Sequence, residues 1–248
     1  MSFTPLVSYE GANSGRGLSP GLWAKQPRDF QDLSVGFGFV DDFLSFDDAS
    51  VRWLLTQASA GTAACDVAAK GGVLLLDSAS STNNQGAQIQ LGGAAAASSF
   101  IASATSKIYY EARVKLADIG STTVQFFAGL SEIDSTLFAS AANSSANHVG
   151  AEAINTTALG VHSEKAGSRS SSASVHTIAD GTYFKIGFVI DGVSKVTPFV
   201  NGEAKTAITT NVPIVELTPS FVCHSSGTTD PILHIDWVAC YQEEQIDN

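Results

Sequence analysis

Basic residues are scarce in this 248-residue sequence, and those present do not cluster. Lysine and arginine together number 13, against 24 aspartate and glutamate residues, which gives a formal net charge of −11. Proteins that bind nucleic acid neutralise its phosphates with clustered lysine and arginine side chains. The composition therefore argues against a nucleic-acid partner.

Cysteine is equally rare, and its spacing excludes the common cysteine-based sites. Cys65, Cys223 and Cys240 are odd in number and contain no CxxC pair, and the five histidines include no HExxH motif. Zinc sites and disulfide frameworks need closely spaced or paired ligands. We expect buried free thiols in a protein made in a reducing cytoplasm, and no zinc site.

Long apolar runs are also missing. No window approaches the roughly 18 apolar residues of a membrane-spanning helix, and residues 1–17 lack the charged and apolar regions of a signal peptide. We therefore expect that the protein has no membrane partner and that no leader exports it.

Alternation of apolar and polar residues is the strongest positive signal. In residues 108–116, every second side chain is apolar, beginning with Ile108 and Tyr110, while Tyr109 and its alternate neighbours form a polar face. A period of two over nine residues predicts a half-buried strand. Residues 117–120 then predict a turn, and residues 123–127 predict a returning strand.

Similar short strands recur along the chain, separated by Gly, Ser and Asn clusters. Segments 40–43, 51–55, 73–77, 85–91, 183–190, 195–200 and 233–241 fit this pattern. Segment 135–146 is expected to form a short helix and segment 165–174 a mobile polar loop. In the last strand, Trp237 shares alternate positions with Leu233 and Ile235, which predicts a core position and a loss of roughly 3–5 kcal/mol for Trp237→Ala.

The first 39 residues differ from the rest. Glycine and proline interrupt any periodic pattern, yet the segment is too apolar for a free tail. We expect an extended N-terminal arm, residues 1–39, before a β-sandwich domain, residues 40–248. The arm either packs along its own domain or docks on a neighbouring subunit, through its large apolar residues Phe3, Leu6, Tyr9, Leu18, Leu22, Trp23 and Phe30.

Three segments together resemble the concanavalin A-like lectin/glucanase jelly roll. They are YYEARVKL at 109–116, FKIGFVIDG with PFVNGE at 184–203, and IDWVACYQ at 235–242, which is similar to the terminal strand of family 16 glycoside hydrolases. The resemblance covers about residues 40–242. It implies an all-β fold, a concanavalin A-like jelly-roll β-sandwich, which the extended arm would precede.

Within that superfamily, the run FFAGLSEIDSTLF at 126–138 resembles proteins of tailed-phage virions. This implies a non-enzymatic virion structural protein, with a capsid decoration or cement protein as the principal prediction. Its expected partner is the major capsid protein, its expected assembly a homotrimer, and its expected location the capsid surface after assembly in the host cytoplasm. The alternative is a carbohydrate-binding adhesion module of a tail or head fibre.

The same run also resembles the catalytic strand of retaining family 16 enzymes, which carries three acidic residues. Glu132 and Asp134 match the first two positions, but Thr136 and Leu137 occupy the two candidate third positions, and neither donates a proton to a departing sugar oxygen. We therefore predict no catalytic residue and no enzymatic activity. An inactive or divergent family 16-like glycanase is the third hypothesis, and a carboxylate from another strand near Glu132 would support it.

Two ligand hypotheses stay open at this stage. A sugar site needs an exposed aromatic platform, and Tyr109 is the best candidate for exposure, with Glu132 and Asp134 completing the candidate ligand face. The acidic pairs Asp41-Asp42, Asp47-Asp48 and Glu132/Asp134 either hold Ca²⁺ or are solvated turn carboxylates. No other cofactor is expected.

Overall fold

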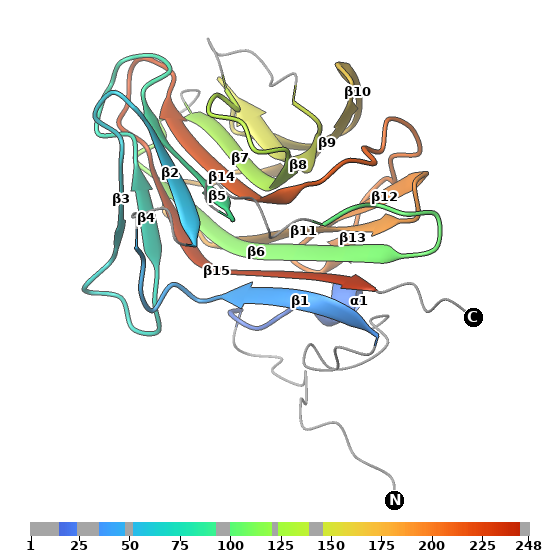
Figure 1. Ribbon diagram of the computed structural model, residues 1–248. Helices are drawn as coiled ribbons and strands as arrows, with labels where there is room; N and C mark the ends of the chain where they lie inside the picture. The colour runs from blue at the N-terminus through green and yellow to red at the C-terminus, as the bar shows by residue number, and fades with distance from the viewer. Residues whose placement is uncertain are drawn as a thin grey trace, which may run out of the picture.

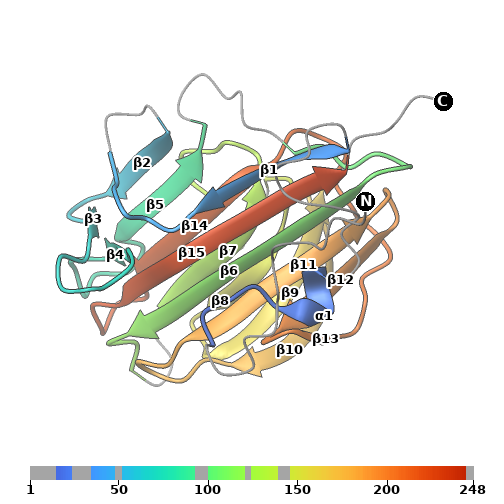
Figure 2. The same ribbon diagram turned by 90° about the horizontal axis from the view of Figure 1, so that it is seen from below.

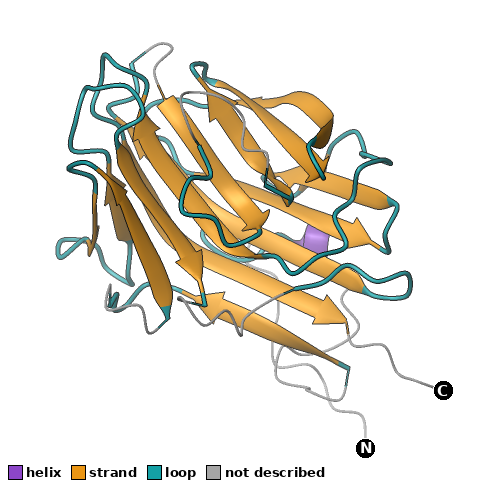
Figure 3. Cartoon of the chain, turned by 45° about the horizontal axis from the view of Figure 1, so that its top comes forward, coloured by secondary structure: helices purple, strands orange, loops and turns teal. Residues whose placement is uncertain are grey.

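The structure is a computed structural model that describes residues 15–23, 35–47, 52–92, 100–120, 124–138 and 146–243. Two antiparallel sheets pack face to face, and α1 (Pro20–Trp23) is the one α-helix among these residues (Figures 1 and 3). The predicted all-β jelly-roll sandwich is confirmed. No helix in the described ranges is long and apolar enough to cross a membrane.

The first sheet includes β15, the last strand of the described residues. Its strands run in the order β13 (Glu203–Ala204), β12 (Lys195–Val200), β11 (Phe184–Asp191), β6 (Lys107–Ala117), β15 (Ile232–Glu243), β4 (Leu74–Asp77) and β3 (Thr62–Cys65), and β1 (Gly36–Asp41) pairs with β15. β1 therefore runs across the predicted boundary between residues 39 and 40.

The second sheet lies above the first in Figure 1. Its order is β10 (Ser168–Thr177), β9 (Ala158–Lys165), β8 (His148–Ile154), β7 (Val124–Ser131), β14 (Thr218–Ser225), β5 (Gly86–Leu91) and β2 (Trp53–Ala58). The prediction of a loop at 165–174 is wrong, because β9 and β10 form a hairpin there. The predicted helix at 135–146 is absent from the described part, 135–138, and residues 139–145 lie outside the described ranges.

The alternation of β6 sets the core between the sheets. The five apolar side chains that alternate from Ile108 to Leu116 are all buried against the second sheet, as predicted. Burial of such side chains drives the association of the two sheets. The free thiols of Cys223 and Cys240 are buried, while Cys65 is partly exposed.

The last strand departs from its predicted alternation. A register shift between Ile235 and Trp237 inserts Asp236 as an extra residue, and a bulge of this kind moves the following side chains to the opposite face. Val238 and Cys240 consequently enter the core in place of Trp237. Trp237 instead packs on the outer face of the first sheet with Ala239 and Tyr241.

Residues 15–23 of the arm cover that outer face (Figure 2). Leu22 and Trp23 are buried there, and the Trp23 ring stacks on Tyr109 at a centroid distance of 5.8 Å. The backbone N–H of Ser19 and the indole Nε1 of Trp23 both donate to the buried Glu111 carboxylate at 2.9 Å. This part of the arm therefore packs along its own domain, through Leu22 and Trp23.

Charged and polar groups also hold residues 15–23 to the first sheet, near Arg16. Arg16 and Arg113 both bind the buried Asp236 carboxylate, at 2.8 and 2.5 Å, and the indole of Trp237 donates to the Arg16 carbonyl at 2.5 Å. Of the remaining predicted arm contacts, Leu18 is partly buried against this cluster, whereas Phe3, Leu6, Tyr9 and Phe30 lie outside the described residues.

Replacing Trp237 by alanine is expected to cost about 3–5 kcal/mol of unfolding free energy, because the side chain is only 7% exposed and joins the arm to the sheet. Urea unfolding would measure it. Val67→Ala is the control, since Val67 is fully exposed and should change stability by less than about 0.5 kcal/mol. A loss below about 1 kcal/mol for Trp237→Ala would contradict the packing described.

Candidate functional site

The acidic pair singled out in the sequence serves the fold. Glu132 Oε2 accepts hydrogen bonds from the backbone and side-chain nitrogens of Asn147, at 3.0 and 2.8 Å. Asp134 Oδ1 accepts from the backbone N–H of Thr136 at 2.8 Å. Each carboxylate therefore accepts a hydrogen bond from a backbone N–H group.

Glutamine side chains fasten this segment to the second sheet. Gln90 Nε2 donates to the Glu132 carbonyl at 2.9 Å and Gln90 Oε1 accepts from the Asp134 N–H at 3.0 Å, while Gln88 Oε1 accepts from the Leu137 N–H at 3.1 Å. Segment 132–138 therefore lies across the outer face of β5.

The prediction that Tyr109 is exposed is wrong. Trp23 of the arm covers it, and only 1% of its surface remains accessible. Its hydroxyl donates to Glu243 at 2.9 Å. A sugar cannot stack on this ring while the arm is docked.

Asp41, one of the proposed calcium ligands, also accepts hydrogen bonds from groups of the fold. Asp41 accepts hydrogen bonds from the Phe43 N–H and the Trp53 indole, both at 2.9 Å. Within the described ranges, no group of three or more His, Cys, Asp and Glu side chains is arranged to hold a metal ion.

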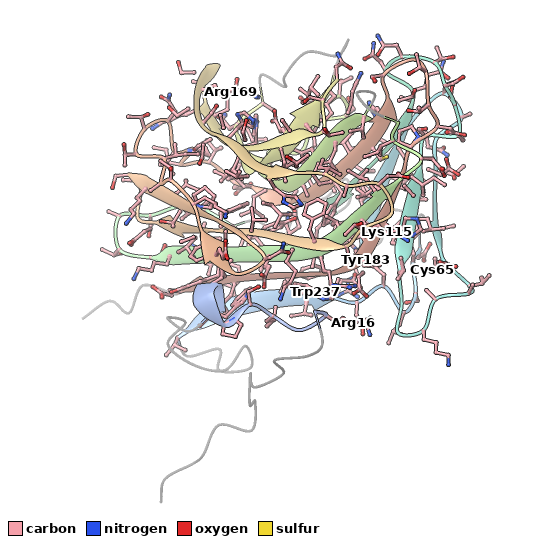
Figure 4. All side chains as sticks on the ribbon, turned by 180° about the vertical axis from the view of Figure 1, so that it is seen from behind. Arg16, Cys65, Lys115, Arg169, Tyr183 and Trp237 are labelled. Atoms are coloured by element: carbon pink, nitrogen blue, oxygen red, sulfur yellow. The ribbon has the colours of Figure 1, made fainter. Side chains whose placement is uncertain are left out.

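The outer face of the second sheet carries a different cluster of ionisable groups, His148, Glu152, His162, Glu164 and Arg169, which we call the ion-pair cluster. They lie on β8, β9 and β10, where Val149, Ala151 and Val161 at the alternate positions enter the core. Figure 4 shows Arg169 on the side of the molecule away from Arg16 and Trp237. Residues 15–23 and the ion-pair cluster therefore lie on opposite faces of the sandwich.

Arg169 connects the two carboxylates of the cluster. Its Nη1 lies 2.7 Å from Glu152 Oε2 and its Nε lies 2.7 Å from Glu164 Oε2. His148, which is fully buried, places Nε2 2.8 Å from Glu152 Oε1. Because one guanidinium contacts both glutamates, these carboxylates are held together with their charge compensated.

These surroundings shift the pKa values of both Glu152 and His162. Burial by itself would raise the pKa of Glu152, but the hydrogen bond from His148 and the nearby positive charges outweigh it and lower that pKa to about 2. Burial lowers the pKa of His162, and the Glu152 charge opposes this shift only in part. At neutral pH the site therefore combines an ionised carboxylate with a neutral imidazole.

A cavity of about 250 Å³, which we call the His162 pocket, opens beside these two side chains. The Nδ1 atom of His162 is 2.7 Å from the Ser171 hydroxyl, which orients the ring. Gly160 makes room for it, since a Cβ atom there would lie 2.7 Å from His162 Nε2. The pocket is lined by Glu152, Ala153, Ile154, Thr156, Ala158, Gly160, His162, Ala173 and Ser174.

A second cavity, the His224 pocket, of about 340 Å³, lies at the β2–β5–β14 end of the same face. Phe127, Leu137, Phe138 and Val222 form a separate apolar cluster on this sheet, and Phe138 belongs to the pocket wall as well. The outer face thus combines a charged cluster, an apolar cluster and an uncharged pocket.

Sequence reasoning missed the ion-pair cluster although a signal was present. His148 and Glu152, and likewise His162 and Glu164, stand at alternate positions of two consecutive strands. That pattern places all four on one face. Because segment 165–174 was interpreted as a loop, Arg169 was not recognised as the strand residue that contacts Glu152 and Glu164.

Comparison with known proteins finds no matching family model, and no curated protein matches. Solved structures do match. An endo-1,3-β-glucanase from Streptomyces sioyaensis is 12% identical, with a TM-score of 0.57, over 84% of this chain and 96% of that one. An endo-β-1,4-glucuronan lyase from Trichoderma reesei is 8% identical, with a TM-score of 0.56, over 82% and 94%. A protein of unknown function from Shewanella oneidensis MR-1 is 13% identical, with a TM-score of 0.58, over 86% and 90%.

These similarities confirm the concanavalin A-like jelly-roll fold and correct the functional prediction. The glucanase and the lyase are glycan-degrading enzymes that match along nearly their whole length. The predictions of a non-enzymatic capsid decoration protein and of no enzymatic activity are contradicted by them. The predicted capsid partner, trimer and virion location have no test in the structure.

Proposed function

We propose that this protein is a glycan-degrading enzyme that hydrolyses a neutral β-glucan at the His162 pocket. The observation that carries the proposal is the pairing of a neutral imidazole, His162, with an ionised carboxylate, Glu152, in the wall of one cavity. The sheet that bears them belongs to a fold shared with glucanases and a glucuronan lyase.

The chemistry follows from the states of these two groups. A water molecule in the pocket attacks the anomeric carbon, and His162 takes its proton as general base while the glycosidic C–O bond breaks. The departing oxygen, on the opposite side of the anomeric carbon, takes its proton from a solvent water, and the proton that His162 then releases neutralises the resulting hydroxide. The Glu152 carboxylate raises the proton affinity of His162, which favours the imidazolium that forms when the water proton is taken up.

The charge balance favours a neutral substrate over a uronic acid polymer. A lyase acting on uronate needs a cation to neutralise the substrate carboxylate. Arg169 already binds Glu152 and Glu164, and His148 has no exposed surface. The formal net charge of −11 adds a repulsive field for polyanions.

The test is incubation of the full chain with lichenan, laminarin and glucuronan, followed by separate measurement of reducing ends and of unsaturated ends. We expect reducing ends from a neutral glucan and no product from glucuronan. Unsaturated ends from glucuronan would show that the reaction is elimination and not hydrolysis. The absence of any product from a wider panel of neutral β-glucans would refute the proposal.

A further inference from the structure

Glu111 is a buried carboxylate that faces the arm. It is 1% exposed, and its Oε2 atom accepts hydrogen bonds from the Ser19 N–H and the Trp23 indole Nε1, both at 2.9 Å. Lys185 on the neighbouring strand β11 donates its Nζ to the Gly17 carbonyl at 2.9 Å, and no cation of the described residues lies within ion-pair distance of Glu111. An ionised Glu111 is therefore a buried charge without a contacting counter-charge, which is a costly state.

The other end of residues 15–23, which we call the Arg16 end, is held differently. The guanidinium groups of Arg16 and Arg113 both contact the Asp236 carboxylate, at 2.8 and 2.5 Å, and the indole of Trp237 donates to the Arg16 carbonyl. Opposite charges in contact stabilise each other's ionised forms. Ionisation of the carboxylate therefore favours attachment at the Arg16 end and opposes it at Glu111.

The short helix α1 fits closely on the first sheet, where it lies over β11 (Figure 2). A Cβ atom on Gly187 of β11 would lie 2.6 Å from Leu22 Cδ1, and the Trp23 ring stacks on Tyr109. Such contacts depend on close fit. We therefore expect α1 to leave the sheet as a unit, together with the two N–H groups that bond Glu111.

The protonation of Glu111 is consequently coupled to the docking of α1. Burial raises the pKa of Glu111 above its ordinary value of 4.5, and the hydrogen bonds from Ser19 and Trp23 offset this shift only in part. When α1 leaves, the carboxyl group returns to water and to its ordinary pKa. The contribution of Glu111 to docking is therefore complete below pH 4.5 and is lost as the pH rises through the raised pKa.

Other titratable groups surround Glu111 and α1. They are Lys185 and Asp191 on β11, Tyr109 on β6, Glu203 on β13, and Tyr241 and Glu243 on β15. Burial raises the pKa of Tyr109 further above its ordinary value of 10, so its hydroxyl stays protonated at pH 8. Glu243 accepts a hydrogen bond from that hydroxyl at 2.9 Å and is the carboxylate to compare with Glu111.

We propose that α1 is a pH-sensitive strap, which neutral Glu111 holds on the first sheet and which loosens when Glu111 ionises. The Arg16 end stays attached in both states. Loosening uncovers the ring of Tyr109, on which Trp23 stacks. The strap lies on the face of the sandwich opposite the ion-pair cluster, so this inference stands apart from the proposed function.

The test is hydrogen exchange of the indole N–H groups in the full chain, measured by NMR. The chain has three tryptophans, of which Trp23 reports α1, Trp237 reports the Arg16 end and Trp53 reports the core. Protection factors correct each rate for the intrinsic pH dependence of exchange and measure local opening. From pH 5 to pH 8 we expect the protection factor of Trp23 to fall at least threefold, while those of Trp237 and Trp53 stay constant.

Two variants identify the group that titrates. Glu111→Gln keeps an oxygen that accepts both N–H groups but cannot ionise, so its Trp23 protection should be equal at pH 5 and pH 8. Glu243→Gln, the matched control, should keep the wild-type fall. Constant Trp23 protection in the wild type, the same fall in Glu111→Gln, or a parallel fall at Trp53 would overturn the inference. If Glu111→Gln does not fold, the Glu111 carboxyl carbon signal of the wild type decides, and a titration midpoint at or below pH 4.5 would overturn it.

Discussion

His162→Gln is expected to lower kcat/KM for glucan hydrolysis by about 10²- to 10⁴-fold, because glutamine cannot take the proton of the attacking water. His176→Gln is the matched control. His176 also has a pKa lowered by burial, but its ring packs on Phe184 at a centroid distance of 4.9 Å, outside the ion-pair cluster. The kinetics of the two variants would be compared after circular dichroism confirms that both fold.

The pH profile of glucan hydrolysis by the wild-type protein should also depend on His162. Only neutral His162 accepts a proton, and burial holds its pKa below 6.5, so activity should persist on the acid side of pH 6.5 and fall at lower pH. In His162→Gln the residual activity should lose this acid limb. Asp134→Asn should keep full activity, since Asp134 accepts a hydrogen bond within a turn. Full activity in His162→Gln with loss in Asp134→Asn would instead place the active site at the acidic pair.

Arg169→Met is expected to cost about 3–5 kcal/mol of unfolding free energy, as much as Trp237→Ala. The substitution leaves Glu152 and Glu164, which are 3% and 5% exposed, without the cation that both contact. The control is Lys205→Met, which breaks a pair with the exposed Glu203 at 3.1 Å and should cost less than about 1 kcal/mol. Denaturant unfolding of both variants measures the difference.

The cost of Arg169→Met should depend on pH in one direction. The folded-state pKa of Glu152 is lowered to about 2 from 4.5, so its contribution is complete above pH 4.5 and is lost as the pH falls toward 2. The difference between wild type and Arg169→Met should therefore be largest near neutral pH and shrink between pH 4.5 and 2. A constant difference across that range would mean that the guanidinium stabilises the fold through packing alone.

Much of the fold was readable in the sequence because a core-facing strand alternates strictly. β6 follows that rule from Ile108 to Leu116, and its neighbour β11 was recognised for the same reason. β10 was missed because it is an edge strand with largely accessible side chains. A polar edge strand has the composition of a loop, and only its partner β9 shows that it is paired.

The positions of single side chains were less predictable. Trp237 was placed in the core by alternation, but the extra residue at Asp236 moved it to the outer face. Tyr109 was placed in solvent, but residues 15–23, far away in sequence, cover it. In both cases the decisive contact joins segments that lie far apart along the chain, which no local pattern reveals.

The placement of β15 has a consequence for how the chain folds during synthesis. This last strand pairs with β6, β4 and β1, and the contact between Trp237 and Arg16 joins residues 221 positions apart. Loop closure over such distances is slow, and none of these pairings can form before residues 232–243 have left the ribosome. Until then the nascent chain exposes one edge of β6 and the apolar side chains that β15 would cover.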